Sequence, residues 1–128
     1  MLNYQRGDNL LNIDMEFKKG ILFVRLRGIL DEKTVDKLND EVTELIRDNG
    51  VNNIVFNIEG LSTIDSYGIN ALLKNYELCH KERGQTLLCG IENPLVKYRL
   101  NNSRILKYMY ETSDELTAID IINPKENL

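Results

Sequence analysis

The sequence has few of the residues that metal sites and hydrolytic centres need. It holds one histidine and two cysteines in 128 residues. Cys79 and Cys89 match no metal or redox spacing, and a zinc site takes about four ligands. We therefore expect no metal or nucleotide cofactor, two small buried cysteines and a surface position for His80.

Long hydrophobic runs are also missing. The longest, residues 21–24, stops at Arg25, whereas a membrane-spanning helix needs about 20 apolar residues. Residues 1–11 lack the basic, apolar and small-residue order of a secretory signal. The sequence therefore predicts a cytoplasmic protein with no membrane partner.

No strong positive charge is present either. The net charge is −4, from 16 basic and 20 acidic residues, which opposes nonspecific attraction to phosphate backbones. Nucleic acid is therefore not expected as a partner. A local basic cluster is interpreted as a solvated surface without a function; it consists of Lys97, Arg99, Arg104 and Lys107.

The pattern of apolar residues predicts strands and helices in alternation after an opening hairpin. Repeats, low-complexity stretches and linkers are not found, so one domain is expected. The predicted elements are a β-hairpin of 11–17 and 21–26, a helix over 33–48, a central strand over 54–58, a helix from Ser66 to Gly84, a strand over 86–89, a short helix from Asn93-Pro94, a last strand over 105–109 and a final helix capped by Thr112 and Glu115. This order is typical of an α/β fold with a mixed central sheet.

The segment between the central strand and the following helix holds the candidate site. In α/β sheets, binding sites gather where the chain leaves the carboxyl end of a strand for a helix. Asp65 and Ser66 stand at that junction. A phosphate on Ser66 would meet the positive end of the helix dipole and would repel an acidic partner. Asp and Ser are also preferred helix caps, and from the residues alone a plain cap is the favoured interpretation.

Two motifs add a family resemblance. Residues 57–69, Asn-Ile-Glu-Gly-Leu-Ser-Thr-Ile-Asp-Ser-Tyr-Gly-Ile, resemble the signature segment of STAS domains, in which a strand, a short loop and Asp-Ser lead into a helix. Residues 27–31, Arg-Gly-Ile-Leu-Asp, resemble the corner before the first helix of that family. The likeness extends over about residues 11–122, and it implies a single STAS domain over 1–128 with tails at 1–10 and 123–128.

The resemblance to STAS anti-sigma factor antagonists implies a function in partner switching rather than catalysis. In such proteins the unmodified form binds an anti-sigma factor, which is often the serine kinase, and frees a sigma factor. Phosphorylation of the serine that matches Ser66 cancels binding, and a phosphatase restores it. Tyr67 and Asn70 depart from the residues usual in the family.

The partner surface is predicted at the ends of neighbouring strands. It comprises Asp31, Asp65, Ser66, Tyr67 and Gly68, because successive strand ends of a parallel sheet lie side by side. Tyr67 is the expected anchor, since a tyrosine offers a large rigid surface with a polar tip.

Two alternatives stay open at this stage. One is a STAS scaffold that is never phosphorylated. The other is a receiver-like phosphotransfer domain, with Asp65 as the acceptor and Asp31-Glu32 as a Mg²⁺-binding acid pair. A hydrolase is disfavoured because Ser66 has no base nearby.

Overall fold

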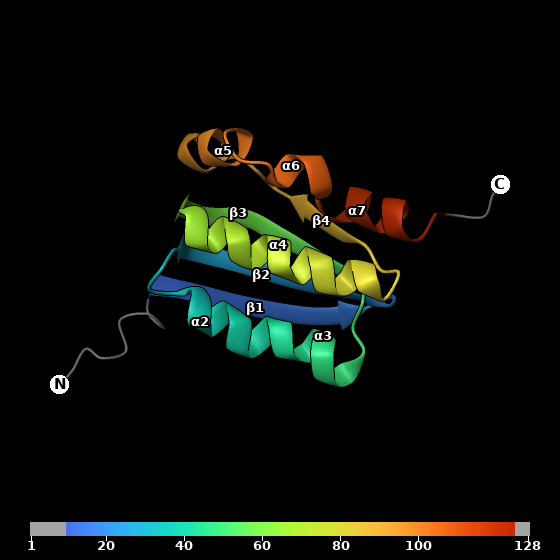
Figure 1. The fold of residues 1–128 in the computed structure, drawn as a ribbon. Helices are drawn as coiled ribbons and strands as arrows, with labels where there is room; N and C mark the ends of the chain where they lie inside the picture. The colour runs from blue at the N-terminus through green and yellow to red at the C-terminus, as the bar shows by residue number, and fades with distance from the viewer. Residues whose placement is uncertain (1–9, 125–128) are drawn as a thin grey trace.

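The computed structural model describes residues 10–124 (Figure 1). The elements are, in chain order, β1 (Leu11–Lys18), β2 (Ile21–Leu30), α2 (Val35–Leu38), a π-helical turn η1 (Asn39–Thr43), α3 (Glu44–Asn49), β3 (Ile54–Ile64), α4 (Ser66–Lys81), β4 (Thr86–Cys89), α5 (Pro94–Asn101), α6 (Ile105–Tyr108), β5 (Tyr110–Thr112) and α7 (Glu115–Ile122). The segments predicted as tails, 1–10 and 123–128, lie outside the described residues except at 10, 123 and 124.

The five strands form one mixed sheet in the order β1-β2-β3-β4-β5. β1 and β2 form the predicted antiparallel hairpin, and the other neighbouring pairs are parallel. The hairpin turn places Lys19 and Gly20 at φ 56° and 77°, the left-handed pair that matches the twist of two-residue hairpins. β3 lies at the centre, as the apolar run at 54–58 predicts.

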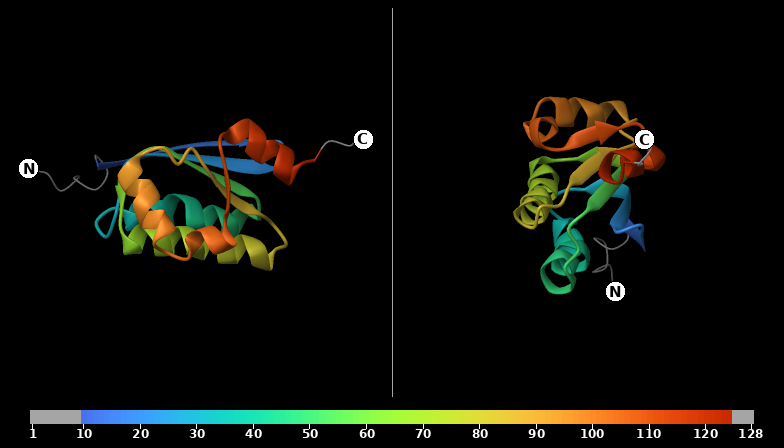
Figure 2. Two further views of the ribbon diagram at one scale, coloured as in Figure 1. Left: turned by 90° about the horizontal axis from the view of Figure 1, so that it is seen from above. Right: turned by 90° about the vertical axis from the view of Figure 1, so that its right-hand side faces the viewer.

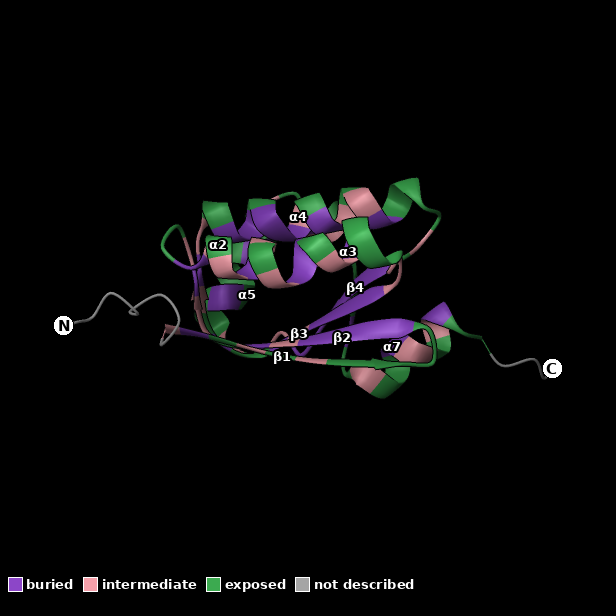
Figure 3. Ribbon diagram, turned by 90° about the horizontal axis from the view of Figure 1, so that it is seen from below, coloured by how far each residue is buried: buried purple, intermediate pink, exposed green. Residues whose placement is uncertain are grey.

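The helices lie on two sides of the sheet. α2, α3, α4, α5 and α6 cover one side, and α7 lies on the other (Figures 1 and 2). Burial follows this arrangement, because the helices turn their buried faces toward the strands and the outer strand β1 is largely exposed (Figure 3). The main core cluster fills the first side and a smaller cluster lies under α7.

The helix predicted over 33–48 is present, with one irregularity. It runs through α2, η1 and α3 and stops at Gly50, whose φ of 72° is the left-handed conformation common after a helix end. Within the π-helical turn, the buried Thr43 hydroxyl donates to Asn75 Oδ1 of α4 at 3.1 Å. Asn75 in turn donates to the Ala71 carbonyl at 2.9 Å. These bonds satisfy the polar groups buried between the two helices.

One predicted element near the C-terminus is wrong, and the predicted final helix is present with a different cap. Residues 105–109 form a helical turn, α6, rather than a strand, and the last strand is Tyr110–Thr112. Ile105 and Met109 are buried, whereas Lys107 between them is exposed; strand alternation would place all three on one face, so the burial pattern is helical. The cap of α7 is Asp114, whose Oδ1 accepts from Thr117 N at 2.9 Å. Thr112 belongs to β5 instead.

Other predictions about buried groups are confirmed. Cys79 and Cys89 are buried free thiols, and His80 is exposed. In the part of the chain that the structure describes, no helix is long and apolar enough to cross a bilayer.

Candidate functional site

The candidate site lies where β3 ends and α4 begins. β3 runs to Ile64, beyond the predicted strand and through the expected loop, because it pairs with β2 as far as Leu30 and Ile64. Two register shifts occur on the way, between Arg25 and Arg27 and between Gly28 and Ile29. The pairing brings the ends of both strands together at one edge of the sheet.

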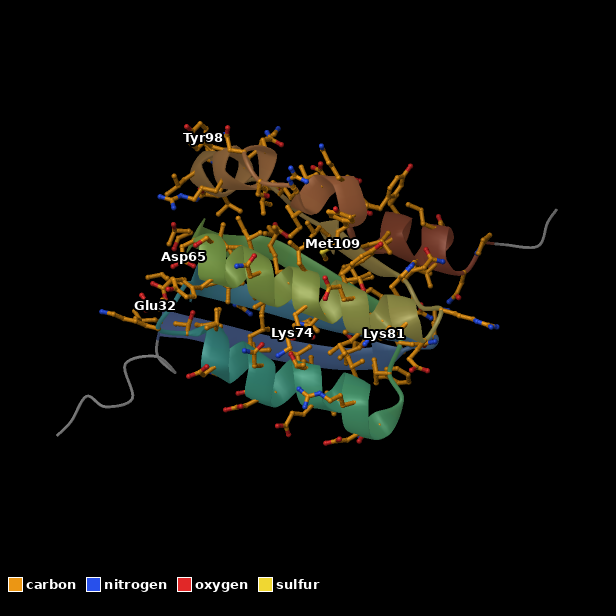
Figure 4. All side chains as sticks on the ribbon, viewed as in Figure 1. Glu32, Asp65, Lys74, Lys81, Tyr98 and Met109 are labelled. Carbon is orange, nitrogen blue, oxygen red and sulfur yellow. The ribbon has the colours of Figure 1, made fainter. Side chains whose placement is uncertain are left out.

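Asp65 joins the two strand ends. Its backbone N–H donates to the Leu30 carbonyl at 3.2 Å. Its Oδ1 accepts from the Gly68 N–H at 3.0 Å, which makes it the cap of α4, and its Oδ2 accepts from the Glu32 N–H at 3.1 Å. The carboxylate therefore ties the first turn of α4 to the corner after β2. Figure 4 shows Glu32 and Asp65 at the same end of the molecule.

The corner after β2 is a hydrogen-bonded turn in its own right. Asp31 Oδ1 accepts from the Lys33 N–H at 2.9 Å. The buried Thr34 hydroxyl accepts from the Asp31 N–H and donates to the Ile29 carbonyl, both at 2.9 Å. Thr34 was not among the predicted site residues, although a threonine three residues after an aspartate is a common turn signal.

Gly68 lets the first turn of α4 pack closely on the ends of β2 and β3. It is buried, and a Cβ there would lie 2.6 Å from the Leu30 carbonyl oxygen and 2.8 Å from Ile64 Cγ1. Such distances are shorter than a real side chain can adopt, so any other residue would push α4 away from the strand ends. Gly68 thus sets the distance between the first turn of α4 and the sheet. Its contact with a partner stays a prediction.

Ser66 and Tyr67 point outward from the first turn of α4. Both are exposed, and Tyr67 keeps 53% of its surface accessible. The Ser66 side chain makes no hydrogen bond within the described residues. Its hydroxyl lies at the positive end of a sixteen-residue helix, where a phosphate is electrostatically favoured.

Within residues 10–124, no hydrogen bond joins the Ser66 hydroxyl to a histidine or a carboxylate. The chain's one histidine, His80, lies on the same helix, about 21 Å further along its axis at 1.5 Å per residue, and it stacks on Tyr76. Groups of three or more metal-ligating side chains are absent from residues 10–124. The exposed hydroxyl at the start of α4 can receive a phosphate or contact a partner.

α5 supplies a second wall that the sequence analysis missed. A hollow of about 290 Å³ separates the start of α4 from α5 and is lined by Asp65 and Ser66 on one side and by Tyr98, Arg99 and Asn102 on the other. Figure 4 shows Tyr98 at the same end of the molecule as Asp65. Arg99 was predicted as one member of a solvated basic cluster. Its exposure agrees with that prediction, but its place beside Ser66 depends on how the helices lie and has no local sequence signal.

Comparisons with known proteins agree with this geometry. The STAS domain family model matches residues 12–117. An anti-sigma F factor antagonist of Paenibacillus polymyxa is 33% identical over 109 residues, which cover 85% of this chain and 92% of that protein. The solved structure of the anti-sigma factor antagonist SpoIIAA in its unphosphorylated form superposes with a TM-score of 0.78 at 26% identity, covering 91% of this chain and all of that one.

A second solved structure shows the modified form of the same kind of protein. The phosphorylated form of the Bacillus cell fate determinant SpoIIAA matches with a TM-score of 0.68 at 25% identity, covering 88% of this chain and all of that one. Family match, curated relative and solved structures all cover most of the chain. The chain therefore belongs to the STAS domain family.

Proposed function

We propose that this protein is an anti-sigma factor antagonist whose binding is switched off by phosphorylation of Ser66. It acts in the cytoplasm as a single domain with a core at about 11–122. The unmodified protein binds an anti-sigma factor that is also a serine kinase, and a sigma factor is released. A phosphatase restores binding. The observation that carries the proposal is the unpaired, exposed Ser66 hydroxyl on a first turn that Asp65 and Gly68 hold in place.

The proposed modification is an ordinary phosphoryl transfer. The Ser66 oxygen attacks the γ-phosphorus of ATP, the bond to the bridging oxygen of ADP breaks, and the hydroxyl proton passes to a base of the kinase. The product adds nearly two negative charges beside Asp65. A partner packed on this surface would have to bury that charge or move away, so binding is lost.

Tyr67 is the proposed anchor of the partner surface. It is the exposed aromatic residue next to Ser66, and its ring stacks on no other aromatic ring among the described residues. Aromatic side chains of this kind often contribute most of the binding energy at an interface. Asp31 and Asp65 complete the surface, because their backbones come together at the ends of β2 and β3.

Binding measurements with point variants test the proposal. The probe is the anti-sigma F factor homologue encoded by the same genome, titrated calorimetrically. Ser66→Asp should weaken binding about tenfold or more by placing charge in the interface. Tyr67→Ala should cost about 2 kcal/mol of binding and should leave the unfolding midpoint almost unchanged.

Matched controls lie far from the site. Ser113→Asp changes an exposed serine before α7, and Tyr110→Ala removes a tyrosine that is 67% exposed on β5. Both controls should bind as the unchanged protein does. If Ser66→Asp and Tyr67→Ala also bound with unchanged affinity, the partner surface would lie elsewhere and the proposal would be wrong.

The chemical form of the phosphate separates this function from the receiver-like alternative. After incubation with the kinase and ATP, mass spectrometry should find an acid-stable ester on Ser66, which disappears in Ser66→Ala. Fragment ions distinguish Ser66 from Tyr67. An acid-labile phosphate that is lost in Asp65→Ala would favour the receiver-like domain, and no phosphate at all would favour the constitutive scaffold.

A further inference from the structure

α5 is held rigidly against the core beside Ser66. Asn93 caps it, since its Oδ1 accepts from Leu95 N at 2.8 Å and from Val96 N at 3.2 Å. Val96 and Leu100 are buried in the main core. With its inner face fixed in this way, α5 presents its outer residues at defined positions.

The outer residues of α5 divide into two flanks. An α-helix turns about 100° per residue, so Arg99 and Lys97 lie on opposite flanks, and Tyr98 and the C-cap residue Asn102 line the hollow together with Arg99. Lys97 is not part of that lining. Asn102 is already engaged, because its Nδ2 donates to the Tyr98 carbonyl at 2.8 Å.

Arg99 is the one positively charged side chain among the described residues that line this hollow. It forms no ion pair in the described part of the chain. The neighbouring carboxylate of Asp65 already accepts two backbone hydrogen bonds. An unpaired guanidinium therefore faces the hollow in which a phosphate on Ser66 would lie, and guanidinium groups bind phosphate through paired hydrogen bonds.

We propose that Arg99 binds the phosphate of phosphorylated Ser66 within the same molecule and so closes the hollow between α4 and α5. The inference rests on the proposed phosphorylation of Ser66. It adds a second effect to the added charge: the modified surface loses a recess that a partner side chain can enter.

The test uses full-length protein with phosphoserine incorporated at position 66 during translation, so that no kinase is needed. The second ionisation of the phosphate is followed by phosphorus NMR as the pH is varied. The charged groups around it are Asp65, Asp31 and Glu32 from the neighbouring corner, and Arg99 from α5. A nearby guanidinium lowers the phosphate pKa and the carboxylates raise it.

Arg99→Gln should raise the phosphate pKa by about one unit, and Arg99→Lys should recover part of the difference. Lys97→Gln removes the same charge from the opposite flank and should have little effect. If the phosphate pKa were the same in Arg99→Gln as in the unchanged protein, Arg99 would not bind the phosphate. The proposed function fails separately, if the phosphorylated protein binds the anti-sigma factor as tightly as the unmodified one.

Discussion

The two faces of the sheet are built in different ways. The face under α2 to α6 is packed by one large apolar cluster that includes Phe56 and Leu72. The face under α7 has a small cluster around Phe23 and Val55, and beyond it lie polar side chains. The first face therefore provides most of the stability and fixes the Ser66 end of α4. The packing of the second face depends on one short helix, α7.

α7 is attached to the sheet partly through a polar network. Arg25 on β2 donates from Nε and Nη2 to the two carboxylate oxygens of Glu115, each at 2.8 Å. Asn57 on β3 adds a third bond to Glu115 at 2.9 Å. Arg25 also reaches Asp14 and Glu16 on β1. A bidentate pair of this kind is geometrically specific, so it fixes where α7 lies as well as adding to its attachment.

Truncation of one buried phenylalanine on each face is the strongest test of this comparison. Phe56→Ala should lower the free energy of unfolding by about 4 kcal/mol and Phe23→Ala by about 3 kcal/mol. The loss is smaller at Phe23 because α7 can move to fill part of the space. Urea denaturation measures both values, and an equal or reversed order would contradict the proposed difference between the faces.

The two cysteines report on the faces separately, since Cys79 belongs to the large cluster and Cys89 to the small one. Burial raises the pKa of both thiols, that of Cys89 to about 12. Short peripheral helices open more often than a main core, so a thiol reagent should modify Cys89 about tenfold faster than Cys79 under native conditions. That ratio corresponds to about 1.4 kcal/mol in the free energy of opening.

A variant of α7 provides the control for thiol labelling. Ile122→Ala trims a side chain that packs in the small cluster, so it should accelerate labelling of Cys89 and leave Cys79 almost unchanged. Equal acceleration of both thiols would mean that the faces open together as one cooperative unit.

Acid should weaken the α7 face first. Hydrogen bonds from Arg25 are the main reason why the pKa of Glu115 lies below its ordinary value of 4.5, with Asn57 contributing further. A carboxyl group with a lowered pKa in the folded state stabilises the fold above its unfolded pKa, and that contribution disappears as the pH falls through the folded value. Stability measured by denaturation should therefore decline below about pH 4.5, more weakly in Glu115→Gln. Glu92→Gln, at an exposed position, should keep the full decline.

Local patterns predicted most of the framework because their causes are local. Apolar alternation in β1 and β2, the run at Ile54 to Ile58 and the Asn93-Pro94 helix start each act over a few residues. The same reasoning failed at Ile105, where a short apolar run fits a helix and a strand equally well. It also predicted Thr112 as the cap of the last helix, whereas β5 extends through Thr112 and Asp114 is the cap.

The part of the candidate site that depends on short-range sequence patterns was predicted from the sequence. Asp65 and Ser66 follow a recognisable strand, and the ends of parallel strands lie side by side, which predicts the closeness of Asp31. The bond between Arg25 and Glu115 spans 90 positions in the sequence, and the position of Arg99 beside Ser66 depends on the crossing of α4 and α5. Neither contact has a signal in its own segment, so only the folded chain shows them.

The two backbone hydrogen bonds accepted by Asp65 have a consequence for the thermodynamics of association. They hold the first turn of α4 and the corner after β2 in one arrangement before any partner arrives. Ordering a mobile backbone costs about 1–2 kcal/mol per residue in conformational entropy, and a surface that is already ordered does not incur that cost on binding. The proposed switch can then act by changing the chemistry of a rigid surface, with no refolding step between the bound and released states.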